Sequence, residues 1–237
     1  MQFFVELVII LAVSGLFMPL CTAVSNSEFA RRQRTRVFRP TKISPGAHLR
    51  SFVTNSVVST GLLFAVTLPF QDRLFVTSSV GTWRAIYEAA AILLLYDFGY
   101  YLLHRFVLHE WSWGRKVHAV HHTVRTPFAK DSLYIHPIET ALGMGLFLLC
   151  SVLLHPIGVT SFLLALLVYS LLNVFIHSAI DLQTFPFRTL TSLVRHHDIH
   201  HDSMKAGYYA SITPLWDVIF RTTGEPLSHK PKADALS

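Results

Sequence analysis

Charged residues and cysteine are scarce in this sequence. Asp, Glu, Lys and Arg together make up 14% of the 237 residues and hydrophobic residues make up 51%, whereas an average soluble domain carries about 25% charged residues. The two cysteines, Cys21 and Cys150, both lie inside apolar runs, so neither a disulfide framework nor a CxxC metal or redox motif is available. The composition argues against an ordinary soluble domain and favours a membrane protein.

Positive charge is concentrated in one short stretch. The formal net charge is +6, but seven of the twenty basic residues fall within residues 31–50, directly after the first apolar run. That placement is typical of the cytoplasmic flank of a membrane helix. We therefore do not expect the chain to bind nucleic acid.

Four apolar runs indicate the membrane helices. They cover residues 3–24, 52–70, 85–103 and 141–176. The first run, as a helix of 22 residues, would extend about 33 Å and cross the hydrocarbon core. The last run is interrupted by His155, Pro156 and Gly158, and we interpret it as a helical hairpin. The sequence thus predicts an all-α integral membrane protein with four to five transmembrane helices.

The same runs predict a topology. If residues 31–50 are cytoplasmic, the second helix crosses outward, the third returns, and the hairpin begins and ends on the cytoplasmic side. All histidine clusters would then lie in a cytoplasmic helical cap, in either a bacterial inner membrane or an endoplasmic reticulum. We expect membrane helices and a basic loop in residues 1–83, a catalytic domain in residues 84–224 and a disordered tail in residues 225–237.

Histidine is abundant in one part of the chain. Twelve of the fourteen histidines lie between residues 104 and 201. Three groups contain most of them: HRFVLH with His104 and His109, HAVHH with His118, His121 and His122, and RHHDIHH with His196, His197, His200 and His201. The i, i+3, i+4 spacing in the second and third groups places three imidazoles on one helical face. Two such triples are difficult to explain as ordinary packing.

The first pair is less informative by itself. His104 and His109 are five residues apart, about 140° around an ideal helix. They converge only if the helix end unwinds or if two metals share them. Histidines at a membrane interface would give the same pattern.

Further candidates flank these groups. His177 ends the returning leg of the hairpin and is a candidate ligand, whereas His136 precedes the outgoing leg and is expected to support a ligand or the fold. Asp97 lies seven residues before His104 on nearly the same helical face, so it is expected either to orient a ligand imidazole or to pair with a basic residue. Asp198 is expected to accept the other ring N–H of a histidine, and Glu139 to be a supporting or surface carboxylate. His155, at the hairpin turn, is left out of the site.

The number of histidines implies two metal ions. Eight or more imidazoles exceed the four to six ligands of one ion, and neutral imidazole suits iron, zinc or copper. A pair of transition metals can bind dioxygen or activate water. Spacing alone does not choose between these two chemistries.

The three histidine groups also resemble the motifs of a known protein family. HRFVLH, HAVHH and HHDIHH resemble the histidine boxes of the fatty acid hydroxylase and sterol desaturase superfamily, and YDFGYYLLHR, TPFAKDSLYIHPIE and the sequence after the third box extend the likeness over residues 84–224. The resemblance implies that one set of histidines binds two non-haem irons: His104, His109, His118, His121, His122, His197, His200 and His201, with His177 and His196 as additional ligands. It also implies that the irons use dioxygen and two electrons to hydroxylate or desaturate a lipid C–H bond. Zinc can occupy such a site in purified protein.

The resemblance implies partners as well. The chain carries no fused cytochrome b5 domain, so electrons are expected from a separate donor, of the cytochrome b5 or ferredoxin type with its reductase. Residues 31–50 could dock an acidic donor, although anionic lipid explains them equally well. The expected substrate is a sterol-like or acyl lipid that enters laterally from the bilayer.

Two other functions compete with a lipid oxygenase. A di-zinc membrane hydrolase or lyase would use the same histidines to activate water, and iron content with oxygen dependence would distinguish it. A metal transporter or sensor would need polar residues along a path through the bilayer. Clustering of the histidines at one face argues against that path.

Overall fold

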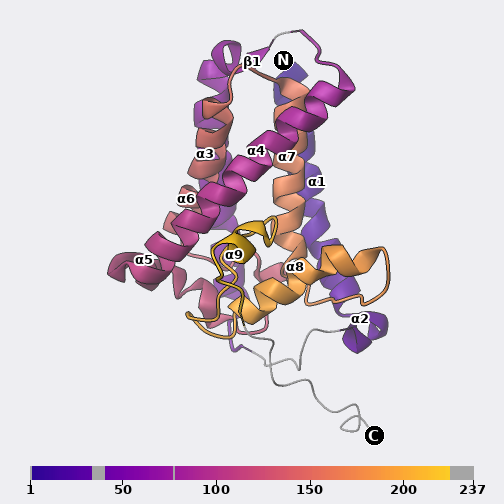
Figure 1. Ribbon diagram of the computed structural model, residues 1–237, viewed down its shortest axis with the longest axis vertical. Helices are drawn as coiled ribbons and strands as arrows, with labels where there is room; N and C mark the ends of the chain where they lie inside the picture. Colours follow the sequence, from indigo (N-terminus) through magenta and orange to yellow (C-terminus); the bar gives the residue numbers. More distant parts are fainter. Residues whose placement is uncertain (1, 34–40, 77, 225–237) are drawn as a thin grey trace, which may run out of the picture.

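The computed structural model describes residues 2–33, 41–76 and 78–224 of the protein. Figure 1 shows a bundle of long helices with the N-terminus at its upper end and a cap of short helices and loops at its lower end. The described strands are two residues each, β1 (Phe75–Val76) and β2 (Ile157–Gly158), and they pair in parallel. The regular structure is therefore almost entirely helical, as the sequence predicted.

Three helices are long and apolar enough to cross a bilayer. These are α1 (Gln2–Ser25), α3 (Pro45–Leu74), and α4 (Thr82–Leu102) together with the π-helix η1 (Leu103–Glu110) that continues it. Ser44 caps α3 by accepting a hydrogen bond from the Ala47 N–H, and Pro45 occupies the first helical position, where proline is favoured. All three coincide with predicted apolar runs.

The interrupted fourth run forms the hairpin. Helices α6 (Pro137–Leu153) and α7 (Val159–Phe175) have 17 residues each, shorter than the three spanning candidates. The chain breaks between them at the predicted turn, where β2 pairs with β1. Glu88 of α4 stabilises this turn, because its carboxylate accepts hydrogen bonds from the Gly158 N–H at 2.8 Å and the Ser161 hydroxyl at 2.6 Å.

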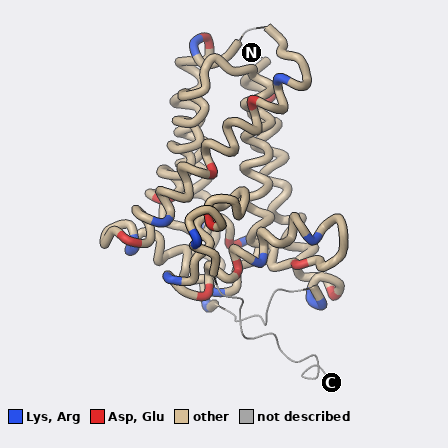
Figure 2. Tube along the Cα trace, viewed as in Figure 1, with Lys and Arg blue, Asp and Glu red and all other residues tan. Residues whose placement is uncertain are grey.

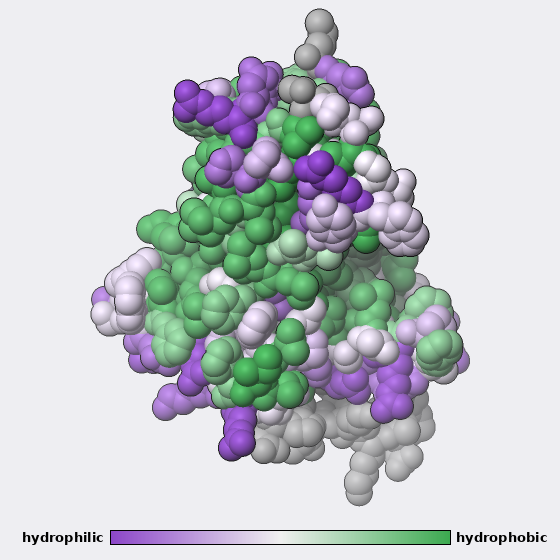
Figure 3. Space-filling model, turned by 45° about the horizontal axis from the view of Figure 1, so that its top comes forward, coloured by the Kyte–Doolittle hydropathy of each residue, from purple (hydrophilic) through white to green (hydrophobic). Residues whose placement is uncertain are grey.

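The helices pack around one apolar core. Helix α4 packs against α6 and α7, α1 packs against α7, and α3 packs against α6. Fully buried side chains at their contacts include Ile92, Phe147 and Leu166. Figure 3 shows a broad apolar surface over the bundle between more polar ends, which is the surface expected of a bundle surrounded by lipid.

The cap contains the remaining elements. They are α2 (Glu28–Arg32), α5 (Ser112–His118), η2 (His121–Thr123), η3 (Ala129–Asp131), α8 (Phe187–His200) and α9 (Leu215–Ile219). Most of the Lys, Arg, Asp and Glu residues lie at this end of the molecule (Figure 2). The predicted tail, residues 225–237, and part of the basic loop, residues 34–40, lie outside the described residues.

Candidate metal centre

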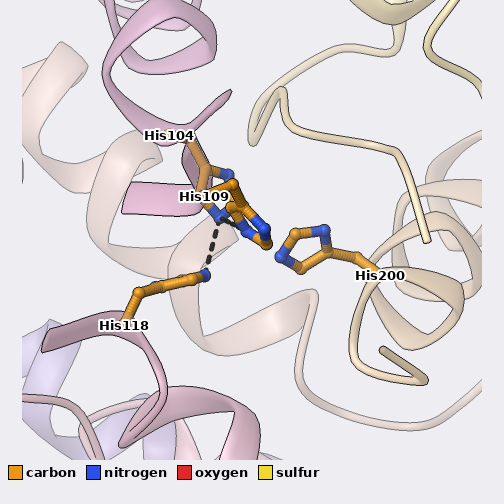
Figure 4. Close-up of side chains that lie close together, drawn as sticks. All are labelled: His104, His109, His118 and His200. Atoms are coloured by element: carbon orange, nitrogen blue, oxygen red, sulfur yellow. Dashed lines mark hydrogen bonds between the residues drawn. The ribbon is translucent and has the colours of Figure 1, made fainter. Parts of the chain in front are cut away.

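Nine imidazoles converge where the cap meets the bundle. Eight of them form two groups, in each of which four ring nitrogens lie within 4.8 Å of one another. The first group is His104, His109, His118 and His200, and the second group is His121, His177, His197 and His201. Figure 4 shows the first group, whose four rings point toward a common centre: His104 and His109 from one segment, and His118 and His200 from two others.

The π-helix explains how His104 and His109 reach the same group. In η1 each backbone hydrogen bond spans five residues, as in the bond of 3.0 Å from the Trp111 N–H to the Phe106 carbonyl. Residues five apart then lie on nearly the same face of the helix. The helix end widens rather than unwinds, and both imidazoles enter one site.

The two histidine triples are divided between the groups. Helix α5 ends at His118, and the following turn sends His121 to the second group while His118 stays in the first. In the same way, α8 sends His200 to the first group and His197 to the second. Each triple therefore contributes to both sites, so the two sites are built as a unit.

His122 completes the first group. Its Nε2 lies 3.1 Å from Nε2 of His118 and 3.0 Å from Nε2 of His200. The first group thus offers five imidazoles and the second group four. The predicted ligands other than His196 all lie in these two groups.

The hydrogen bonds of the rings determine which nitrogen carries the proton. The Nδ1–H groups of His104 and His200 donate to the carbonyls of Tyr209 (2.7 Å) and Gly207 (2.8 Å), and a carbonyl can only accept. In the second group, the Nδ1–H of His201 donates to the Val124 carbonyl at 2.7 Å. The Nε2 atoms of these neutral rings therefore carry lone pairs, and these lone pairs face one another.

Facing lone pairs call for a cation between them. The Nε2 atoms of His104 and His118 are 2.9 Å apart, the contact dashed in Figure 4, and those of His197 and His177 are also 2.9 Å apart. Two nitrogens bonded to one ion at about 2.1 Å and at right angles would be about 3.0 Å apart. The residues present therefore fit a transition-metal ion in each group.

Burial keeps these imidazoles neutral. It lowers the pKa of His177 to about 4 and the pKa of His200 to about 3. Burial, and then the neighbouring imidazoles, also lower the pKa of His201 well below its usual range. Neutral imidazole is the form that binds metal.

A loop after the third histidine group orients the first group. The carbonyls of Met204, Gly207 and Tyr209 accept the Nδ1–H groups of His109, His200 and His104 respectively. Gly207 has φ +79°, a conformation that favours glycine. This loop was not recognised in the sequence, because backbone carbonyl acceptors leave no side-chain pattern.

Asp97 does not orient an imidazole directly, which corrects the prediction. Its carboxylate accepts hydrogen bonds from the backbone N–H groups of Ser211, Ile212 and Thr213 and from the Thr213 hydroxyl. Asp217 holds the adjoining residues in the same way, through the N–H groups of Tyr209 and Ala210. The two carboxylates thus fix the loop, and the loop fixes the histidines.

Glu139 contacts an imidazole of the first group. Its Oε1 accepts the Nδ1–H of His118 at 2.8 Å, and both side chains are buried. His136, which was expected to support a ligand or the fold, caps α6 by accepting the Ile138 N–H on its Nδ1. The clue in the sequence was the position of Glu139 in the first turn of the helix that starts beside the histidines.

His196 and Asp198 lie beside the groups. The His196 ring stacks on Tyr208 with centroids 4.2 Å apart and lies outside both groups. It precedes His200 by one turn, about 6 Å along the helix, and Tyr208 lies against it there. Asp198 is buried on α8. His155, left out of the site by the sequence, is at the far end of the hairpin and is exposed.

A cavity of about 340 Å³ leads from the histidines into the bundle. Its cap end is lined by His104, His121, His177 and His197 together with Glu139, and its remaining walls come from α1, α3, α4, α6 and α7. The walls are mainly apolar. A lipid-sized ligand could therefore reach both histidine groups without leaving the bundle.

The fold and the site together define a helical protein with apolar helices of membrane-spanning length and a buried polyhistidine centre suited to two metal ions. The sequence profile of the fatty acid hydroxylase family matches residues 89–222, which is more than half of the chain. The chain therefore belongs to the fatty acid hydroxylase family, in agreement with the resemblance of its histidine boxes.

Individual relatives match over the same region. Methylsterol monooxygenase 1 of Rattus norvegicus is 37% identical over 134 residues, covering 53% of this chain and 43% of the relative. The cholesterol 25-hydroxylase-like protein of Danio rerio is 31% identical over 154 residues, covering 62% of this chain and 60% of the relative. The chain spans about half the length of the curated relatives that it matches. No solved structure matches it significantly.

Proposed function

We propose that this protein is a membrane-bound oxygenase that uses two iron ions and dioxygen to hydroxylate or desaturate a lipid. The observation that carries the proposal is the pair of buried histidine groups at the end of an apolar cavity. The names of the relatives, which include a methylsterol monooxygenase and a cholesterol 25-hydroxylase-like protein, support a sterol-like substrate.

In this proposal His104, His109, His118, His122 and His200 bind one ion, and His121, His177, His197 and His201 bind the other. When bound, the iron pair would supply the capacity to bind dioxygen and to oxidise a C–H bond. Glu139 and the carbonyls of Met204, Gly207 and Tyr209 hold the ligand rings in their tautomers. Asp198, buried between ligand positions on α8, is proposed to assist in positioning them.

The remaining residues of the site bind substrate and exclude water. The apolar walls of the cavity hold the lipid chain or ring system with a C–H bond toward His104 and His121. The same walls keep bulk water from the oxidising centre. His196, outside both groups, is not proposed as a ligand.

The same elements support a proposal for the membrane arrangement. We propose that α6 and α7 enter the bilayer with the three longer helices, which gives four to five membrane helices, and that the cap lies on the cytoplasmic side of an endoplasmic reticulum or a bacterial inner membrane. The concentration of basic residues at the cap end supports that side. Electrons would come from a separate donor of the cytochrome b5 or ferredoxin type with its reductase.

The test is oxygen-dependent lipid oxidation by membranes that contain the protein. Membranes with the wild-type chain or with His121→Ala are incubated with labelled dioxygen and a reductant, and their lipids are compared by mass spectrometry. We expect a labelled alcohol or a new alkene with the wild type only, together with two irons per purified chain. Lipid conversion that continues without dioxygen, or in protein stripped of metal, would refute the proposal.

A further inference from the structure

Two walls of the cavity come from helices outside the matched family region. Helices α1 and α3 precede residue 89, where the match begins. Residues of α1, including Ser14, Gly15 and Met18, line the cavity opposite residues of α3, including Ser56, Ser59 and Thr60. This part of the cavity is therefore built by residues that precede the matched region.

The two helices are joined to the molecule at their ends. At the end far from the histidines, the rings of Phe4 and Phe64 stack with centroids 5.6 Å apart. At the cap end, the Ser25 hydroxyl donates to the Ser178 carbonyl at 2.9 Å, and the Ser51 hydroxyl donates to the Leu133 carbonyl at 2.8 Å. Between these ends α1 packs on α7 and α3 on α6, with no extended packing of α1 on α3 among the described residues. In Figure 1 the two helices lie on opposite sides of the bundle.

The cavity reaches the surface of the bundle between them. Gly15 of α1 lines the cavity and is also exposed. A Cβ placed on Gly15 would have no atom within 4 Å, so there is open space beside this residue. This opening lies in the middle of a helix that is long enough to span the bilayer, where lipid would be its neighbour.

The rim of the opening offers hydrogen-bond acceptors. The Ser14 hydroxyl donates to the Ile10 carbonyl at 2.8 Å and the Ser59 hydroxyl donates to the Ser56 carbonyl at 3.2 Å. With their protons engaged in this way, both oxygens keep lone pairs that can accept a further hydrogen bond. Polar side chains at this depth in a membrane helix are expected to face a cavity or a partner rather than lipid.

The residues that line the cavity do not suit an anionic ligand. No lysine or arginine lies among the described residues that line the cavity. An anionic group such as the phosphates of an acyl coenzyme A would have no cation to pair with, and burying it unpaired is strongly unfavourable. An uncharged hydroxyl, which donates one hydrogen bond, suits the acceptors of the rim.

We propose that the opening between α1 and α3 is the entrance from the bilayer, and that it selects an uncharged lipid alcohol whose hydroxyl donates one hydrogen bond to Ser14 or Ser59. This inference rests on the proposed function, because it names the substrate class of the same cavity. It assigns the entrance and the selectivity to residues that precede the matched family region.

Gly15→Leu tests the entrance, and Gly61→Leu is its matched control. Gly61 on α3 is also exposed with no atom within 4 Å of an added Cβ, but it does not line the cavity. Both changes replace a helical glycine by a better helix former, so both variants are expected to fold. Full-length protein is purified in detergent, its metal content is measured, and binding of radiolabelled cholesterol is used as the probe.

We expect Gly15→Leu to reduce cholesterol binding at least tenfold with metal content unchanged, and Gly61→Leu to bind within twofold of the wild type. Equal cholesterol binding by the two variants would refute the proposed entrance. A wild-type protein that binds no cholesterol overturns the assignment of a lipid alcohol.

A second arm tests the hydroxyl. Cholesterol is compared with its methyl ether, which lacks the donor, and with stearoyl coenzyme A, as competitors of the labelled probe. Loss of one hydrogen bond is expected to weaken the ether about fivefold in the wild type. In the double variant Ser14→Ala with Ser59→Ala, the two sterols should compete equally. Equal competition in the wild type, or strong competition by stearoyl coenzyme A, overturns the selectivity.

These outcomes are separate from those of the proposed function. Binding is measured without turnover, so the expected binding pattern in a protein that oxidises no lipid would refute the oxygenase and support the entrance. Oxidation of lipid by a Gly15→Leu protein at the wild-type rate would support the oxygenase and refute the entrance.

Discussion

At the scale of single residues, His118 differs from the other histidines of the first group in its partner. His104, His109 and His200 donate their Nδ1–H to backbone carbonyls, whereas His118 donates to the carboxylate of Glu139. A carboxylate partner raises the basicity of an imidazole and strengthens its bond to a metal. We therefore expect Glu139 to make His118 the strongest donor of its group.

The substitution Glu139→Gln tests this role. The amide that it introduces is an uncharged acceptor, so the first site should bind its ion about tenfold more weakly, with the second site unaffected. Metal affinity is measured by competition with a chelator of known strength. Ser151→Ala, on the same helix and away from the histidines, serves as the control. Unchanged affinity at both sites would show that Glu139 does not act through His118.

His200 and His196, one turn apart on α8, allow a proposed ligand to be compared with a histidine outside both groups. His200 contributes Nε2 to the first group, whereas His196 stacks on Tyr208 outside both groups. We expect His200→Ala to bind one metal per chain and to lose activity at least a hundredfold, because no nearby nitrogen replaces it. His196→Ala should retain both metals. Elemental analysis of the two purified variants checks the prediction, and loss of a metal from His196→Ala would contradict it.

At the scale of elements, the relative position of the π-helix η1 and helix α5 depends on the close contact between them. Gly114 of α5 is buried against the backbone of Val107 in η1, and a Cβ at this position would overlap the Val107 carbonyl. Backbone atoms cannot move aside as a flexible side chain can. The contact therefore fixes η1, which carries His104 and His109, relative to His118 at the end of α5.

Gly114→Ala should separate these two elements. The overlap is expected to destabilise the protein by about 1–3 kcal/mol, as overpacking does in other buried sites. The melting temperature should fall, and metal should be lost preferentially from the first group. Gly46→Ala, at the exposed start of α3 where an added Cβ meets no atom within 4 Å, should leave both quantities unchanged. A Gly114→Ala protein as stable as the wild type would refute the argument.

At the scale of the whole molecule, the metal centre connects the cap with the bundle. Its candidate ligands come from η1, from α5 and η2, from the turn after α7, and from the end of α8, and the facing nitrogens carry lone pairs that repel without a cation. Bound metal should thus stabilise the arrangement of the cap much more than that of the apolar helices.

Removal of metal tests this difference. Stripping with a chelator should lower the melting temperature by on the order of 10 °C and expose residues 112–131 and 187–213 to protease and to hydrogen exchange. The helices of the bundle should remain protected, and added ferrous iron should restore the cap. Equal protection of the cap with and without metal would contradict the prediction.

Local patterns in the sequence were enough for the helices and for most of the histidines that gather in the two groups. A helix that crosses lipid needs a continuous apolar run, so α1, α3 and α4 could be recognised from composition alone. The i, i+3, i+4 spacing predicted His118, His121 and His122 on one helical face. The three rings do lie near one another, although α5 ends at His118 and the other two follow in η2. Such features depend on residues within one or two turns of each other.

Only the tertiary structure decided which ring belongs to which group and what holds each ring. His118 meets His200 from a distant part of the chain, Asp97 reaches residues 211–213, and Glu139 rather than Asp97 contacts an imidazole. The sequence by itself determined the kinds of donor, the apolar helices and the family. The pairing of distant segments followed from packing and from backbone carbonyls that accept imidazole N–H groups. Every residue carries a carbonyl, so no residue type in the sequence indicates which carbonyls will accept.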